Sequence, residues 1–191
     1  MGSGYGGEMR SRVVAGVLAG MLAVGLTGCT GGDPQPSPTP TPPFASTDAA
    51  YEAAEATYRG YVDAGNQVDL ADPKTFEPVY AWLLGDALGT DKKELTAMAA
   101  HGWQMRGDSK ITVVEPLAWP GSDPTWGDVR IAACVDVHAL SVTDSVGKSM
   151  VLASRPDVQP VKVTFSRDAS TTTGMKIVKI QKRDGKPLCG G

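Results

Sequence analysis

The pattern of apolar and polar positions changes from a helical period to a strand period near Trp103. Before this point, apolar residues recur three and four positions apart in segments near 48–65, 73–83 and 91–101, which predicts three helices. After it, short β-branched or alternating segments are separated by Gly, Pro, Asp and Ser, which predicts strands. Helices followed by sequential strands indicate an α+β domain with an antiparallel sheet.

Each predicted helix has a start signal. Asp48 can cap the first helix, which ends near Gly65. Asp72 precedes a proline that suits the first turn of the second helix, although Pro78 indicates that this helix begins there instead. The segment Asp91-Lys-Lys-Glu94 is typical of a capping box and predicts that the third helix begins there and ends at His101.

The strongest strand pattern runs from Val129 to Ala139. Every second residue, starting at Val129, is apolar, and this face is predicted to contact the core. The opposite face carries Arg130, Cys134, Asp136 and His138 and is predicted to be the outer face. Further strands are predicted at 111–115, 161–165 and 175–182.

An apolar segment of 14 residues, Val13 to Leu26, follows Arg10 and Arg12 near the N-terminus. It is shorter than the roughly 20 residues of a membrane-spanning helix. The sequence Leu26-Thr27-Gly28-Cys29 at its end resembles a bacterial lipobox. We therefore expect residues 1–28 to be a cleaved lipoprotein signal peptide, with translation starting at Met1 or Met9, and Cys29 to carry the lipid. The alternatives are an uncleaved anchor or an ordinary secretory signal.

Lipidation of Cys29 would place the protein on the extracytoplasmic face of the cell membrane, anchored by acyl chains. Residues 29–47 are rich in alternating proline, which favours polyproline II and indicates a semi-rigid spacer. The alternative is a proline-rich ligand for a groove on a partner protein. The remaining residues, 48–191, have the usual size of one domain.

Composition and charge argue against some classes of partner and cofactor. Removal of Glu8, Arg10 and Arg12 with the signal peptide leaves 16 of the 18 basic and 20 of the 21 acidic residues, a net charge of −4. No basic stripe is present, which argues against a nucleic-acid partner. The two histidines and the distant cysteines show no metal-ligand spacing, so we expect no metal and no cofactor.

The chain has three cysteines, and lipidation of Cys29 leaves Cys134 and Cys189. In an oxidising compartment these two are expected to form a disulfide, with the C-terminal tail folded back across the outer face of the sheet. The alternative is two unrelated thiols.

The element order resembles the nuclear-transport-factor-2-like (cystatin-like) cone, and Tyr58-Arg-Gly-Tyr-Val-Asp-Ala-Gly-Asn66 is similar to the end of that fold's first helix. The resemblance implies three N-terminal helices packed on a curved antiparallel sheet of about four strands. With the lipobox and spacer, the chain resembles envelope lipoproteins of high-GC Gram-positive bacteria. The superfamily includes dehydratases, isomerases and epoxide hydrolases, as well as non-catalytic members, so the fold alone implies no activity.

Two arrangements could support acid–base chemistry. Asp136 and His138 share one face of a strand, but this is the predicted outer face, and His101 has the simpler role of a cation at a helix C-terminus. No serine elbow or phosphate loop is present. We therefore assign no catalytic residue. A group of aromatic residues could line a cavity in the cone or could simply be core: Tyr51, Tyr58, Tyr61, Trp82 and Trp103.

Three functions follow from these features. The first is a non-catalytic binding or scaffolding module of the cell envelope, whose partner is another envelope protein. The second is a carrier or sensor of a small apolar ligand held in the cone. The third is an isomerase or hydrolase of the same superfamily. A cavity lined by apolar side chains favours the second, and buried Asp, His or Tyr groups that converge in the cavity favour the third.

Overall fold

A computed structural model describes residues 39–189 of the chain. From Pro40 onward, the described residues belong to one compact unit. The predicted signal peptide, the lipidation site Cys29 and most of the proline-rich spacer lie outside the described residues. No helix within residues 39–189 is both long enough and apolar enough to cross a membrane.

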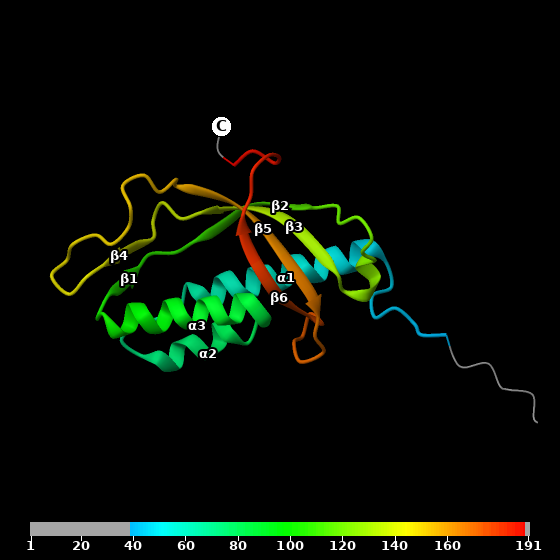
Figure 1. Ribbon diagram of the computed structural model, residues 1–191, viewed down its shortest axis with the longest axis horizontal. Coiled ribbons are helices and arrows are strands. Elements are labelled where there is room, and N and C mark those ends of the chain that lie inside the picture. The colour runs from blue at the N-terminus through cyan, green and yellow to red at the C-terminus, as the bar shows by residue number, and fades with distance from the viewer. Residues whose placement is uncertain (1–38, 190–191) are drawn as a thin grey trace, which may run out of the picture. The chain divides into compact units, whose positions relative to one another are not determined.

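The domain is α+β, with its longer helices first and its longer strands after them (Figure 1). The helices and 3-10 helices are α1 (Thr47–Gly65), η1 (Pro73–Phe76), α2 (Glu77–Tyr80), α3 (Gly85–Ala100) and η2 (Pro124–Trp126). The strands are β1 (Gln104–Arg106), β2 (Lys110–Pro116), β3 (Val129–Asp136), β4 (Ser141–Thr143), β5 (Val158–Arg167) and β6 (Met175–Lys182).

Four strands form an antiparallel sheet in the order β2-β3-β5-β6. Figure 1 shows the sheet curving over α1 and α3, which both lie on the same side of it. A separate two-stranded sheet, β1–β4, extends from one end. The prediction of three N-terminal helices needs a correction, because the helical turn η2 lies between β2 and β3.

The apolar face of β3 that the alternating pattern assigned to the core is buried there. Val129 and Ile131 on β3, and Val163 opposite Ile131 on β5, are at most 1% exposed and belong to the hydrophobic core. The outer face of β3 is also covered, because Cys134 is fully buried there. Side chains on both faces of this central strand are therefore removed from water.

Helix α3 begins at Gly85, six residues before the predicted start at Asp91. Leu84 is the N-cap residue and has extended backbone, and no side chain caps the helix. The Leu84 N–H instead donates to the Ile177 carbonyl at 2.8 Å, and the Ile177 N–H donates to the Trp82 carbonyl at 2.9 Å. A contact with β6, far away in sequence, fixes the start of this helix, so the capping-box pattern was misleading.

Trp82 packs against helix α1 at a glycine. A Cβ atom added to Gly60 would lie 2.5–2.9 Å from three atoms of the Trp82 indole, so only glycine allows this approach. The Trp82 main chain is held by its hydrogen bond to β6, which leaves only the ring free to adjust. Gly60 therefore permits the close packing of the α2–α3 connection on α1.

We expect Gly60→Ala to destabilise the domain by about 1–3 kcal/mol, the usual cost of overpacking. Gly89→Ala is the matched control, because Gly89 is also inside a helix and a Cβ added there meets nothing within 4 Å. It should instead raise stability by up to about 1 kcal/mol through helix propensity. Urea denaturation of both variants measures the difference, and equal effects at the two sites would contradict the packing of Trp82 on Gly60.

Candidate ligand-binding pocket

A pocket of about 390 Å³ lies between α1, α3 and the sheet. Ligand sites in proteins are typically concave and mainly apolar, with volumes from about 300 Å³ upward. Most of its lining is aliphatic or methionine: Val62, Val68, Val79, Leu95, Met98, Met105, Val135, Leu140, Val161 and Ile180. The polar and aromatic lining consists of Tyr58, Tyr61, Asn66, Asp91, Glu94, Ser109 and Gln159, and Gly65 completes it.

Helical spacing brings the two helix walls together. Tyr58, Tyr61 and Gly65 recur along one face of α1, and Asp91, Glu94 and Met98 recur along one face of α3. The rings of Tyr58 and Tyr61 stack with their centroids 6.1 Å apart. The pocket therefore has an aromatic wall on α1 and an acidic wall on α3.

A hydrogen bond joins these walls. The Tyr61 hydroxyl donates to the Asp91 carboxylate, with 2.9 Å between Oη and Oδ2. Burial raises the pKa of Asp91, the Tyr61 hydrogen bond partly opposes this, and the nearby Glu94 charge adds to it. Burial, followed by the charge of Asp91, raises the pKa of Tyr61 well above its usual value. Tyr61 thus remains a neutral donor beside an acidic acceptor.

A second polar pair supports the end of the pocket. The Asn66 side chain donates to the Ser109 carbonyl at 3.0 Å, and the Ser109 N–H donates to the Asn66 Oδ1 at 2.9 Å. These two hydrogen bonds connect the C-terminus of α1 to the segment before β2. They keep the aromatic wall in a fixed position relative to the sheet.

The raised pKa of Asp91 predicts a pH dependence of stability. The folded chain keeps the Asp91 proton at higher pH than the unfolded chain, so stability falls as pH rises above the usual aspartate value of 3.8. Asp91→Asn removes this titration. The stability of the variant relative to wild type should therefore increase between pH 3.8 and the raised pKa of Asp91 in the folded chain.

Asp168→Asn is the control of opposite sign. Hydrogen bonds from Ser170 hold the pKa of Asp168 below its usual value, so this carboxylate stabilises the fold more as pH rises. The relative stability of Asp168→Asn should therefore decrease as pH rises toward 3.8, below the interval in which Asp91 acts. Urea denaturation at a series of acidic pH values measures both slopes, and equal slopes would contradict the burial of Asp91.

The aromatic residues considered as cavity lining occupy different places. Tyr58 and Tyr61 line the pocket, whereas Trp82 packs on Gly60. Tyr51 lines a separate hollow of about 200 Å³ near β2 and β3. Trp103 stacks on His101 with 5.5 Å between ring centroids, just beyond the end of α3.

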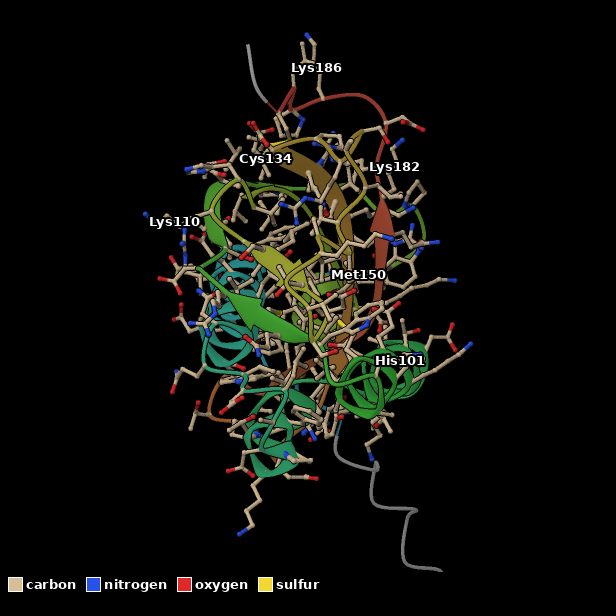
Figure 2. All side chains as sticks on the ribbon, turned by 90° about the vertical axis from the view of Figure 1, so that its left-hand side faces the viewer. His101, Lys110, Cys134, Met150, Lys182 and Lys186 are labelled. Carbon is tan, nitrogen blue, oxygen red and sulfur yellow. A yellow bond between two sulfur atoms is a disulfide. The ribbon has the colours of Figure 1, made fainter. Side chains whose placement is uncertain are left out.

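Neither histidine lines the pocket. His101 is exposed at the C-cap of α3, and Figure 2 shows it far from Cys134. The His138 ring lies 2.8 Å from the Asp136 carboxylate, and the His138 side chain is 63% exposed. Hydrogen bonds from the His138 main chain and ring lower the pKa of Asp136. The pair lies at the end of β3, where His138 is mostly exposed and Asp136 is half-buried.

A disulfide joins Cys134 on β3 to Cys189 in the C-terminal tail, with Cα atoms 5.4 Å apart. Figure 1 shows the tail beyond the end of β6, on the side of the sheet away from the helices. Beneath it, the Arg183 guanidinium is buried and donates to the carbonyls of Gly185 at 2.7 Å and Pro187 at 2.6 Å. The tail is therefore part of the folded domain.

Asp91, Glu94 and Asn66 were not among the residues predicted to form a site. Asp91 and Glu94 were interpreted as a capping box, although the positions of Asp91, Leu95 and Met98 also match one helix face. Within residues 39–189, no group of three or more His, Cys, Asp or Glu side chains could hold a metal ion. The acidic wall consists of the two carboxylates of Asp91 and Glu94.

No family model matches the chain, and no curated protein matches it. Among solved structures, a designed β-sheet protein studied by solution NMR is 16% identical with a TM-score of 0.28, over 74% of this chain and 92% of its own. A putative polyketide cyclase from Xanthomonas campestris pv. campestris is 13% identical with a TM-score of 0.32, over 68% of this chain and 92% of its own. Likenesses at these scores support neither a fold family nor a function.

Proposed function

We propose that the protein is an extracytoplasmic lipoprotein whose domain, a nuclear-transport-factor-2-like cone, holds a small, mainly apolar ligand as a carrier or sensor. The observation that carries this proposal is the pocket of about 390 Å³ with ten aliphatic or methionine side chains in its walls. A scaffolding module needs only an outer surface, whereas a preformed apolar pocket is the usual form of a small-molecule site.

The polar groups in the pocket are placed to orient a ligand. Tyr61, Asp91 and Asn66 contact one another or the main chain at the helix walls, and the sheet side is mostly aliphatic. A ligand would therefore place its polar end toward α1 and α3 and its apolar body against β3, β5 and β6. Sites of this composition use a few polar contacts for orientation and apolar area for affinity.

Fluorescence titration with the uncharged dye N-phenyl-1-naphthylamine tests ligand binding. The protein carries Cys29→Ser, so that no attached lipid competes with the dye. We expect saturable 1:1 binding that Ile180→Trp abolishes, because Ile180 lines the pocket. Gln181→Trp, on the exposed neighbouring position of β6, should keep the wild-type affinity. Binding that survives Ile180→Trp unchanged would count against the pocket as the site.

Detergent phase separation tests the proposed anchor on Cys29. Two acyl chains give lasting membrane attachment, so the wild-type protein made in a bacterial host should enter the detergent phase. The Cys29→Ser variant should lose incorporation of a labelled fatty acid and remain in the aqueous phase if it is exported and processed. Equal labelling of both proteins would contradict lipidation at Cys29.

A further inference from the structure

The charged groups of the pocket are all of one sign. Among the described residues that line it, Asp91 and Glu94 are the only charged side chains, and no Lys, Arg or His joins them. They lie three positions apart on α3, which places both on the pocket side of the helix. The pocket therefore has a negative end and otherwise uncharged walls.

Lys93 and Lys179 lie near this end, in an adjoining hollow that Asp91 also lines, but neither forms a salt bridge with Asp91 or Glu94. Lys179 pairs with Asp86 at 3.9 Å, and the Lys92 ammonium lies 5.3 Å from the centre of the Tyr80 ring. Within the described part of the chain, no salt bridge involves Asp91 or Glu94. The one side-chain partner of Asp91 is the neutral Tyr61 hydroxyl. The negative charge at this end is thus left for a ligand to neutralise.

A bare metal ion fits this site poorly. Cations such as Ca²⁺ require six or more oxygen ligands, whereas the pocket offers two carboxylates and a few neutral oxygens, of which those of Tyr61 and Asn66 are already hydrogen-bonded. The stacked rings of Tyr58 and Tyr61 add aromatic surface, which attracts organic ammonium groups through cation–π contacts. An apolar body joined to a positive charge satisfies both parts of the pocket.

We infer that the pocket selects an organic ammonium ion, with its cationic group at Asp91 beside Tyr61 and its apolar body against Val135, Val161 and Ile180. This inference rests on the proposed function, because it names the class of ligand for the same pocket. The negative end also disfavours anions, since a like charge placed near Asp91 and Glu94 is repelled.

Three probes of one shape and different charge test the inference: benzyltrimethylammonium, the uncharged neopentylbenzene and the anionic phenylmethanesulfonate. Each is titrated into the full chain carrying Cys29→Ser, followed by NMR. We expect the cation to bind at least about tenfold more tightly than the uncharged probe, and the anion to bind most weakly. Asp91→Asn should weaken the cation about tenfold and change the uncharged probe less than about twofold.

Glu94→Gln is the control for general loss of charge, because Glu94 is exposed and Asp91 is half-buried. It should weaken the cation less than Asp91→Asn does. Equal affinities of the cation and the uncharged probe, or equal losses for both in Asp91→Asn, would overturn the inference and leave the proposed function standing. Failure of all three probes to bind would overturn the inference, whereas the dye titration with Ile180→Trp tests the proposed function separately.

Discussion

Removing the Cys134–Cys189 disulfide is expected to lower the free energy of unfolding by about 4 kcal/mol. The bridge joins residues 55 positions apart, and closure of a loop of this length in the unfolded chain accounts for an effect of this size. The disulfide also holds the tail over Arg183, whose guanidinium is hydrogen-bonded to two tail carbonyls. Without the bridge, we expect the tail to detach and Arg183 to become hydrated.

Urea denaturation of the wild-type protein with and without a reductant measures this effect. The double variant Cys134→Ala/Cys189→Ala should match the reduced wild type and should not respond to the reductant. An equal free energy of unfolding for the wild-type protein with and without the reductant would show that this account of the tail is wrong.

The substitution Gly107→Ala is expected to be the most damaging single change outside the core. Gly107 follows β1 with φ +86°, a conformation that costs an alanine about 1–2 kcal/mol. The added Cβ would also collide with the main-chain carbonyl of Ala139, which cannot move away as a flexible side chain can. We expect a total loss of about 2–5 kcal/mol from strain and overpacking together.

Gly147→Ala separates the two contributions. Gly147 has φ +84°, close to that of Gly107, but a Cβ added there meets nothing within 4 Å. It should cost only the conformational strain of about 1–2 kcal/mol. Met105, near Gly107, and Leu140, next to Ala139, both line the pocket. Gly107→Ala should therefore also weaken dye binding. Equal losses of stability in the two variants would contradict the close approach of Gly107 to Ala139.

Local patterns predicted the parts of the fold that depend on local interactions. The β6 segment was predicted at 175–182, as observed, and the apolar face of β3 was assigned to the core correctly. The pair β1–β4 was missed because three-residue strands carry too little periodicity to be recognised. The predicted start of α3 was wrong because a hydrogen bond to β6 determines where this helix begins.

The candidate site was harder to predict than the fold. Asp91 and Glu94 have the spacing of a capping box, and that spacing also places two carboxylates on one helix face. Only the position of β6 beside α3 decides between the two interpretations. Trp82 was considered a lining residue, but its place depends on Gly60, which is 22 residues earlier in the chain. Contacts between distant segments therefore decide which side chains line the pocket.

Methionine-methyl NMR tests most directly whether the hollow between α1, α3 and the sheet is a ligand site. Met98 and Met105 line the pocket, Met150 is exposed on the segment after β4, and Met175 is fully buried in the core. Titration of the Cys29→Ser protein with N-phenyl-1-naphthylamine should shift the Met98 and Met105 signals with one shared dissociation constant and leave Met150 and Met175 unchanged. Shifts confined to Met150, with Met98 and Met105 unaffected, would contradict the account.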